Sequence, residues 1–474
     1  MPGQAEIARR DRFWTITLAL LVVGFGVVVL WKQALMKRPQ GDFGVFARAG
    51  WAVRHNNGAL YRVQDDNVWH YNYPPLFAIL MAPFADPPRR DVAMVTASAL
   101  GHGGSPLNTL AAFGACPNPL LDDHGRYLPY WLSCALFYLA NVGMLFAACH
   151  LLAGAIERCV PAAADAGEAN RRWWWWRVAP ALACAPAVGL NLMRGQVQII
   201  LLLLVVGTLV GLVRGRRFAA GLCLAGAIVL KVFPAFLLLV PLARRDVRCL
   251  AGCGVGLVLG LFVLPVVVLG PEQTTLLYAD FGKLMLGPAL GLGIDELRAD
   301  ELLNATATQS QSFQVVLHKT LHLGIEKVPP EPARWVKVAH LLIGGSMTLA
   351  LLVRGGGFRR AEGLALVGRF GLLTTLMVLV SPVCHLHYLV LIVPMVTVMI
   401  AKREADQPGG AHRDLWAMAL ALTLALALPM LPGLGVLRNV GVPMYAVLWW
   451  WFAGLATRWE GQAGDRQPSL RAAA

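Results

Sequence analysis

The sequence predicts an all-α, polytopic transmembrane helical bundle. Of its 474 residues, 57% are hydrophobic and only 14% are charged. The mean hydropathy is +0.58, far more apolar than a soluble chain needs to fill its core. Apolar runs of roughly 20 residues, enough to cross a bilayer, recur from residue 14 to residue 457. These observations exclude a soluble globular enzyme and predict on the order of ten to thirteen membrane helices.

The charge distribution is that of a multi-pass membrane protein. Lys and Arg total 41 against 27 Asp and Glu, a formal charge of +14. In a membrane protein such an excess marks cytoplasmic loops, so no nucleic acid is expected as a partner. The 9 cysteines include no CxxC pair and mostly lie inside apolar runs, so neither a disulfide framework nor a zinc site is expected.

The first predicted helix runs from Phe13 to Trp31, directly after three arginines. It is longer than a signal-peptide core and has no convincing cleavage site after it. We therefore expect an uncleaved membrane helix whose N-terminus is cytoplasmic. Five further basic clusters lie at residues 171–177, 214–217, 244–248, 354–360 and 402–413. Placing all of them in the cytoplasm orients most of the chain.

The later crossings follow from these clusters. They are expected at residues 196–213, 250–269, 335–353, 364–380, 386–400, 415–431 and 440–455. The segment from Phe218 to Leu242 is basic at both ends and holds Lys231 at its middle, which predicts a hairpin of two short helices with the lysine at its outer tip. The run from Pro74 to Leu100 either dips into the membrane and returns or lies at the outer interface.

We expect one transmembrane domain, residues 1–458, followed by a polar cytoplasmic tail, residues 459–474. A first outer loop covers about residues 32–75, and a large outer loop covers about residues 271–334. Residues from about 87 to 130 form a candidate insertion.

Carboxylates are scarce in the predicted helices. None occurs from Val178 to Ala243, and a carboxylate at bilayer depth normally marks an ion or proton path. This argues against a proton-coupled transporter. The acids gather instead in the outer loops, where a lipid-carried substrate would present its head group.

Asp42 stands near the start of the first outer loop. The apolar residues that follow it have the spacing of a short amphipathic helix lying on the membrane. An Asp in this position is also a common helix N-cap. Tyr73-Pro74-Pro75 likewise suits a rigid first turn of the next helix. The local sequence leaves a capping role and a chemical role for Asp42 both open.

Six pieces of the chain follow one another as in a known family. They are Asp42-Phe43 through Tyr61, Tyr73-Pro74-Pro75-Leu76-Phe77, Gly195-Gln196-Val197-Gln198, Ala220-Gly221 through Pro234, Gln311-Ser312, and Ser381-Pro382 with His385 and His387. With these pieces the chain resembles glycosyltransferase family 87, polytopic GT-C-class enzymes that use polyprenyl-phosphate sugars. It departs from the family at Gln198, where Asn is usual, and at Val232, where proline usually follows the lysine. The candidate insertion at residues 87–130 has no family counterpart.

The resemblance implies an integral membrane hexosyltransferase. It would move a sugar, with mannose leading and a pentose such as arabinose, or another hexose, second, from a polyprenyl-phosphate donor to a lipid or glycan acceptor. The reaction would take place on the outer face of the cytoplasmic membrane, with inversion, no cofactor and no obligatory metal. Asp42 matches the family's general base. The alternative functions are a transporter or flippase of a lipid-linked precursor and, third, a non-catalytic scaffold.

Groups that stabilise the departing phosphate are also implied. The candidate cations are Lys231, Arg194, His385 and His387, with Lys37 and Arg38 as outsiders. Lys231 and Arg194 could instead snorkel from helix ends. His385 and His387 would diverge by about 200° on a helix, so a metal site between them is not expected.

Three uncharged residues complete the implied site. Gln196 and Gln198 either bind the donor or cap and bridge neighbouring helices. Tyr73 is a provisional stacking partner for a sugar ring, although aromatic residues are also common at membrane interfaces.

Overall fold

A computed structural model describes residues 4–36, 41–55, 60–63, 65, 67, 69–87, 127–287, 309–325, 327–354, 357–407 and 413–459. In these residues the regular structure is helical, apart from an isolated β-bridge. Seven of the described helices are long and apolar enough to cross a membrane, and four shorter apolar helices accompany them. The predicted all-α polytopic bundle is confirmed, while the number of crossings stays a prediction.

In the N-terminal half, α9 packs against α6 and α10. The helices of this half are α1 (Gln4–Leu30) with the π-helical η1 (Trp31–Leu35), α2 (Phe43–Arg54), α3 (Pro75–Leu80), η2 (Ala82–Phe84), α6 (Tyr130–Glu157), α7 (Ala166–Ala183), α8 (Ala185–Arg194), α9 (Gln198–Val213) and α10 (Arg217–Leu230).

The C-terminal half continues the bundle. It contains η3 (Phe233–Leu238), α11 (Leu239–Arg244), α12 (Val247–Val258), η4 (Leu259–Val263), α13 (Leu264–Leu269), α14 (Pro271–Phe281), η5 (Gly282–Leu286), α17 (Phe313–Leu321), α18 (Arg334–Val353), α19 (Gly363–Val380), η7 (Leu386–Ile392), α20 (Val393–Asp406), α21 (Arg413–Ala427), η8 (Leu428–Met430), α22 (Gly435–Asn439) and α23 (Val442–Ala456).

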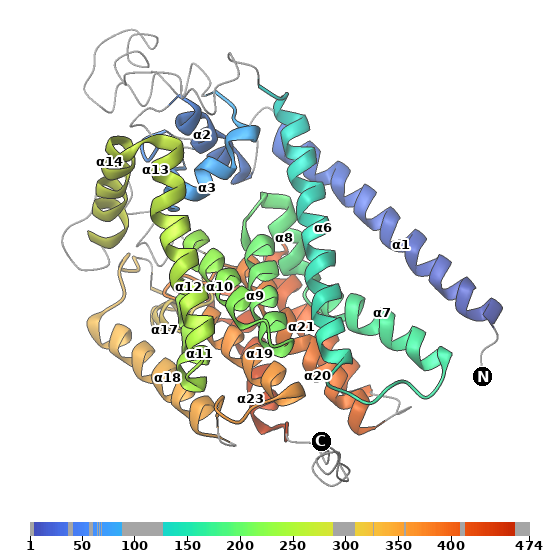
Figure 1. Ribbon diagram of the computed structural model, residues 1–474. Helices are drawn as coiled ribbons and strands as arrows, with labels where there is room; N and C mark the ends of the chain where they lie inside the picture. The colour runs from blue at the N-terminus through green and yellow to red at the C-terminus, as the bar shows by residue number, and fades with distance from the viewer. Residues whose placement is uncertain are drawn as a thin grey trace, which may run out of the picture.

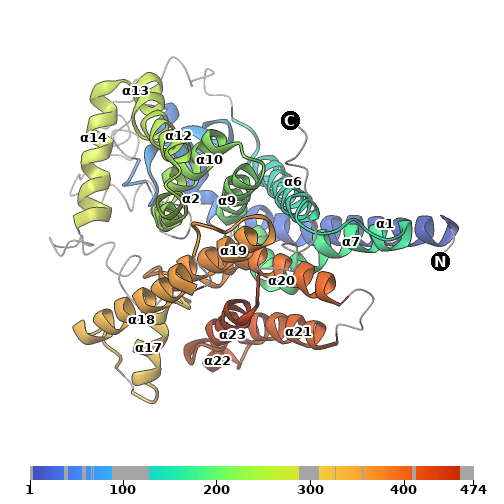
Figure 2. The ribbon, with the colours of Figure 1, turned by 60° about the horizontal axis from the view of Figure 1, so that its bottom comes forward.

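The bundle has a buried centre and two distinct ends. Helix α19 contacts both α9 and α23 and lies between them in Figure 2. Its apolar window is 83% buried, against 22% for α18, so α19 is central and α18 peripheral. Figure 1 shows α2 and α3 at the upper end, whereas α1 starts and α23 lies toward the lower end.

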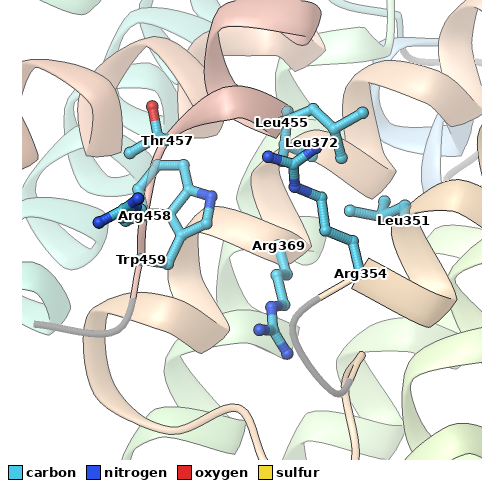
Figure 3. A pocket seen from close by; sticks show the side chains of 8 residues that line it. All are labelled: Leu351, Arg354, Arg369, Leu372, Leu455, Thr457, Arg458 and Trp459. Atoms are coloured by element: carbon cyan, nitrogen blue, oxygen red, sulfur yellow. The ribbon is translucent and has the colours of Figure 1, made fainter.

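A cavity of about 250 Å³ opens at this lower end. It lies between the end of α18, the first half of α19 and the end of α23 (Figure 3). Its lining consists of Leu351, Arg354, Arg369, Leu372, Leu455, Thr457, Arg458 and Trp459. The cavity is separate from the part of the fold that holds Asp42.

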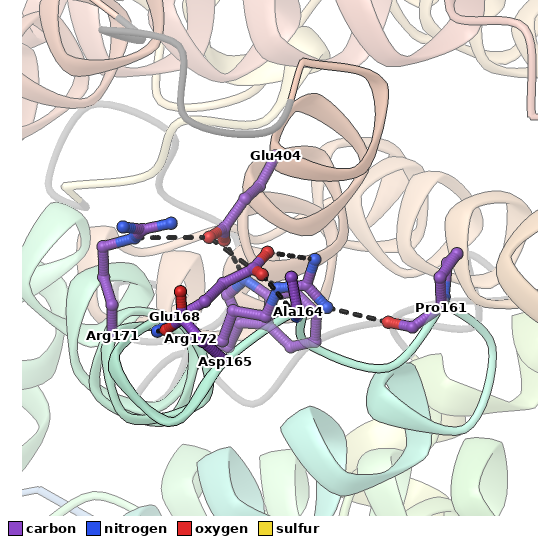
Figure 4. Close-up of polar contacts among 8 residues, drawn as sticks. Pro161, Ala164, Asp165, Glu168, Arg171, Arg172 and Glu404 are labelled. Carbon is purple, nitrogen blue, oxygen red and sulfur yellow. Dashed lines mark hydrogen bonds and ion pairs between the residues drawn. The ribbon is translucent and has the colours of Figure 1, made fainter. Parts of the chain in front are cut away.

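The predicted basic clusters contact one another. Arg171 and Arg172 at the start of α7 lie 3.7 and 3.9 Å from the carboxylate of Glu404 at the end of α20 (Figure 4). These contacts join the cluster at 171–177 to the cluster at 402–413. The clusters at 214–217, 244–248 and 354–360 also contact one another.

Arg217 lies 3.5 Å from Asp246. Arg244 donates hydrogen bonds to the carbonyl oxygens of Phe358 and Ala361. The basic turns therefore share one end of the bundle in two groups, as the positive-inside argument requires. The cytoplasmic identity of that end stays a prediction.

The hairpin at Lys231 is confirmed. Helix α10 ends at Leu230, Lys231 is extended at φ −147° and ψ 138°, and η3 starts at Phe233. Pro234 has no N–H for a regular helix and suits this first turn. Helix α10 packs closely on α12, because a Cβ on Gly221 would overlap the Cys249 carbonyl oxygen.

One expectation about the first outer loop is wrong. Helix α2 forms, but all of its 12 residues are buried, so it is not an amphipathic helix on the membrane surface. Packing against η2 explains this, because a Cβ on Gly50 would overlap Met81, and Arg48 pairs with Asp86. Of the run from Pro74 to Leu100, the structure describes residues 74–87, where α3 and η2 have 6 and 3 residues and are too short to cross a membrane.

Other boundaries need smaller corrections. The crossing expected from Leu386 starts as the 3₁₀ helix η7, and α-helix begins only at Val393. The large outer loop contains helices α14 and α17, as its length allowed. Lys37, Arg38, residues 88–126 of the candidate insertion and residues 460–474 of the tail lie outside the described residues.

Candidate active site

Asp42 occupies the N-cap position of α2 without capping it. Its backbone is at φ −85° and ψ −4°, and its side chain makes no capping hydrogen bond, whereas N-cap residues are usually extended. The Gln196 amide donates to Asp42 Oδ2, and the Arg194 guanidinium lies 3.9 Å from the same oxygen. The carboxylate is thus turned toward the turn between α8 and α9.

Gly195 makes that approach sterically feasible. It ends α8 in the left-handed region at φ +65°, and a Cβ there would lie 2.8 Å from Phe43 Cβ and 3.1 Å from Gln33 Oε1. Glycine alone meets both demands without strain. The backbone N–H of Asp42 then donates to the Arg194 carbonyl at 2.7 Å, which explains the Gly-Gln pair seen in the sequence.

Two opposing effects act on the pKa of Asp42, namely burial of its carboxyl and nearby positive charge. Burial raises the pKa of its carboxyl above the ordinary value, and Arg194 and Gln196 partly offset this. Lys231 also lowers the Asp42 pKa. A buried carboxylate with a raised pKa is a stronger base than an exposed one.

The side chain of Lys231 points toward the side chains around Asp42. Its ammonium donates to the Tyr388 hydroxyl at 2.6 Å and lies 5.2 Å from the centre of the Tyr73 ring. Burial lowers the pKa of Lys231 to about 7, and Asp42 opposes that shift. The lysine therefore lies within electrostatic reach of the carboxylate rather than snorkelling away from it.

His385 and His387 do not diverge. Their rings stack with centroids 5.3 Å apart and planes 14° apart. The expected divergence of about 200° assumed an α-helix, but His385 is extended at the start of the 3₁₀ helix η7. Burial, followed by Lys231 and Arg194, lowers the pKa of His385 to about 3. Burial therefore disfavours the charged form of His385, and its role at the donor phosphate stays a prediction.

The segment at Gln311-Ser312 joins the histidines. Ser310 forms an isolated antiparallel bridge with His385. The Ser310 hydroxyl accepts from the Cys384 N–H at 2.9 Å, and the Ser312 hydroxyl donates to the Pro382 carbonyl at 2.9 Å. Two pieces separated by about 70 residues in sequence are thus held side by side.

Tyr73 lies in an aromatic cluster. Its ring centroid is 5.5 Å from Phe46 and 5.7 Å from Phe77. Burial raises the pKa of its hydroxyl well above the ordinary value, and Tyr388 and Asp42 add to that rise. Tyr73 is thereby within electrostatic reach of the candidate base.

Several buried amides around this group have atoms without a hydrogen-bond partner among the described residues. They are Asn191 Oδ1, Gln196 Oε1, both amide atoms of Gln198, and Gln311 Oε1. An unpaired buried polar atom costs about 1–3 kcal/mol, so such atoms normally find a partner. Their concentration here suits a site that receives a polar ligand.

A family model, glycosyltransferase family 87, matches residues 71–382. The chain belongs to this family. No curated protein and no solved structure matches it. Of the candidate site residues, Tyr73, Arg194, Gln196, Gln198 and Lys231 lie inside the matched range.

Asp42, His385 and His387 lie outside the matched range, so their place in the site rests on the geometry. Together with the transmembrane bundle, family membership makes the protein a membrane-embedded glycosyltransferase. Its polyprenyl-phosphate dependence, sugar and acceptor belong to the proposal below.

Three further residues lie in the candidate site, and sequence reasoning gave none of them a role there. Tyr388 pairs with Lys231, Asn191 donates to the His387 carbonyl at 3.0 Å, and Gln311 is fully buried beside Cys384. A polar residue in an otherwise apolar run was the available signal for Asn191. For Tyr388 the available signal was its position in the sequence beside His385 and His387.

Asp65, a second acid of the first outer loop, makes hydrogen bonds within its own turn. Its Oδ1 accepts from the backbone N–H groups of Asn67 and Trp69 at 2.9 and 2.8 Å. Burial raises its pKa to about 6. The carboxylate is thus engaged in holding its own turn. Asp66 lies outside the described residues.

The described part of the chain has no group of three or more His, Cys, Asp or Glu side chains placed to hold a metal ion. Among the described residues, the candidate cations beside Asp42 are Lys231 and Arg194.

Proposed function

We propose that this glycosyltransferase moves mannose from a polyprenyl-phosphate donor to a lipid or glycan acceptor on the outer face of the cytoplasmic membrane. The observation that carries the proposal is the position of the Asp42 carboxylate. It is released from helix capping, contacts Gln196 and Arg194, and lies within reach of Lys231.

Asp42 acts as the general base. It takes the proton from the acceptor hydroxyl as that oxygen attacks the anomeric carbon, while the bond to the donor phosphate breaks. Attack on the face opposite the phosphate inverts the anomeric centre. The raised pKa of Asp42 suits proton transfer near neutral pH.

Lys231 and Arg194 stabilise the departing phosphate. Each supplies a positive charge where negative charge develops, and a buried setting strengthens that interaction. His385 and His387 contribute hydrogen bonds, with His385 in its neutral form. Gln196 and Gln198 offer amide atoms to the sugar hydroxyls or the phosphate. Tyr73 forms an apolar wall for the sugar ring.

The two ends of the bundle support this location. The basic turns gather at one end, and α2 with Asp42 lies at the other (Figure 1). In our proposal the basic end is cytoplasmic, so that the N-terminus is in the cytoplasm and Asp42 is at the outer face. We further propose that residues 1–458 act as one catalytic domain.

The test is sugar transfer from a panel of polyprenyl-phosphate donors in membranes that contain equal amounts of each variant. We expect the wild-type chain to use mannose, and Asp42→Asn to lose roughly 10²–10⁴-fold in rate because the base is gone. Glu272→Gln is the matched control, since Glu272 is an exposed acid of α14. Equal transfer by wild type and Asp42→Asn would exclude Asp42 as the base.

The same assay tests the donor. Transfer of a pentose in place of mannose would overturn the choice of sugar. If no polyprenyl-phosphate donor supports transfer in the presence of a suitable acceptor, the proposed donor class is wrong.

A further inference from the structure

The C-terminal end of α8 leads directly into the turn that contacts Asp42. The last residue of the helix is Arg194, and Gly195 and Gln196 follow it. The last four carbonyl groups of an α-helix have no partner within the helix, and each needs a donor from elsewhere. The donors that these carbonyls find therefore decide where Arg194 and Gln196 lie relative to Asp42.

The turn itself satisfies two of the four carbonyls. The N–H of Gly195 donates to the carbonyl of Leu192 at 3.3 Å, and the N–H of Gln196 donates to that of Asn191 at 3.0 Å. With Gly195 left-handed at φ +65°, these bonds form a Schellman motif. The motif does not use the last two carbonyls of the helix.

Gln33 and Asp42 supply the remaining donors. The side-chain amide of Gln33 donates to the carbonyl of Met193 at 2.9 Å and also to that of Leu192 at 3.1 Å. The carbonyl of Arg194 accepts from the backbone N–H of Asp42 at 2.7 Å. The end of α8 is therefore completed jointly by Gln33 and by the backbone of the candidate base.

An irregular turn at the end of α1 presents Gln33 to this helix end. The π-helical η1 is closed by the N–H of Met36, which donates to the carbonyl of Trp31 at 3.1 Å. Single π-turns within α-helices are frequent at functional sites. Gln33 is 2% exposed, whereas Trp31 and Leu35 are 59% and 60% exposed. One polar side chain of this turn is thus buried between apolar neighbours that are exposed.

Gln33 also packs against the backbone on both sides of the Asp42 contact. A Cβ on Gly41 would lie 3.0 Å from Gln33 Cγ and 3.3 Å from the carbonyl oxygen of Arg194. A Cβ on Gly195 would lie 3.1 Å from Gln33 Oε1. The side chain therefore lies between the residue that precedes Asp42 and the residue that follows Arg194.

We propose that Gln33 is a positioning residue of this glycosyltransferase, which caps the C-terminus of α8 and thereby holds Arg194 and Gln196 against Asp42. This inference rests on the proposed role of Asp42 as the base. Gln33 acts through the turn and not on the substrate. Without the cap the end of α8 shifts, and the guanidinium and the amide lose their contacts with the carboxylate.

The first readout is hydrogen–deuterium exchange of the full-length protein in detergent, without donor or acceptor. Gln33→Met removes both hydrogen bonds at nearly constant length, and Gln33→Asn keeps an amide on a shorter side chain. In both variants we expect faster exchange in the peptides that contain the N–H groups of Asp42 and Gln196. Tyr138→Phe is the matched control, because the Tyr138 hydroxyl ties α6 to α1 by donating to the Val22 carbonyl at 2.7 Å. Its loss should leave those two peptides unchanged.

The second readout is the acid limb of kcat/KM against pH. The charged and titratable groups within electrostatic reach of Asp42 are Arg194, Lys231, Asp65, Tyr73 and Tyr388. Arg194 and Gln196 lower the pKa of Asp42, so their displacement raises it. Because the base works only when deprotonated, the acid limb of Gln33→Met should move to higher pH. Its kcat/KM should fall by roughly ten- to a hundredfold, and Tyr138→Phe should keep the wild-type limb.

Three results would overturn the proposal in variants whose melting temperatures verify that they are folded. They are unchanged exchange at both peptides in the two Gln33 variants, equally fast exchange there in Tyr138→Phe, and faster exchange with an acid limb that stays at its wild-type pH. Failure of the proposed function is distinguishable from these. If Asp42→Asn transfers sugar as fast as the wild type, Asp42 is not the base, and the exchange experiment still decides whether Gln33 holds the turn.

Discussion

The ammonium of Lys231 donates a 2.6 Å hydrogen bond to the hydroxyl of Tyr388, 157 residues away in the sequence. The same ammonium lies 4.0 Å from the centre of the Tyr388 ring. The tip of the α10–η3 hairpin is thereby tied to the start of η7, which also carries His387. This contact holds one of the two cations that we propose to stabilise the departing phosphate.

Removing the Tyr388 hydroxyl should leave the Lys231 ammonium less firmly positioned. Tyr388→Phe keeps the ring and deletes one charge-assisted hydrogen bond, with a cost of about 1.5–3 kcal/mol. We expect kcat/KM for transfer to fall by roughly tenfold or more. Tyr445→Phe is the control, because Tyr445 is exposed on α23. Unchanged kinetics in Tyr388→Phe would mean that Lys231 needs no partner for its function.

The pH dependence of transfer should have an alkaline limb. Lys231 carries its charge below its pKa of about 7 and loses it above that pH. Activity that depends on the charge is therefore full on the acid side of this value and declines as pH rises through it. Protonation of Asp42 gives a separate acid limb, above the ordinary Asp value. A profile of kcat/KM against pH measures both limbs.

Lys231→Arg tests the assignment of the alkaline limb. Arginine keeps its charge across the accessible range, so the limb near pH 7 should vanish in any residual activity. A limb that stays in place in this variant would belong to another group.

Gly195 should be required for activity beyond its effect on stability. In Gly195→Ala, the left-handed backbone costs about 1–2 kcal/mol, and the added Cβ also meets Phe43. We expect the Asp42–Gln196 contact to shift and transfer to fall sharply. Gly215→Ala carries the same backbone strain, at φ +72°, but has open space around its Cβ. Measured transfer at equal protein level should therefore be lost only in the first variant.

Gln198 and Gln33 should respond in opposite ways to replacement by methionine. Gln198 is buried with both amide atoms unpaired within the described structure, so Gln198→Met should raise the melting temperature of the donor-free enzyme and increase KM for the donor. Gln33 donates to the carbonyls of Leu192 and Met193, so Gln33→Met should lower the melting temperature. The expected changes are about 1–3 kcal/mol. A destabilised Gln198→Met would show that Gln198 has a structural role.

Much of the architecture was predictable because its causes are local. Apolar runs of bilayer length identify membrane helices, and the basic turns orient them. The hairpin around Lys231 followed from basic residues at both ends of one apolar segment and Pro234 near its middle. Asp42 stood out because carboxylates are rare beside the membrane helices, and the resemblance to family 87 gave it a proposed role.

Contacts between distant residues were decided by the tertiary structure. The full burial of α2 depends on its packing against residues up to Asp86, so its apolar spacing alone suggested a surface helix. The stacking of His385 on His387 depends on a 3₁₀ turn held by Ser310. Hydropathy and charge indicate whether each segment contacts water or lipid. They do not indicate which residues of separate helices come together. The pairing of Lys231 with Tyr388 and the grouping of arginines around one cavity therefore arise only when those helices pack.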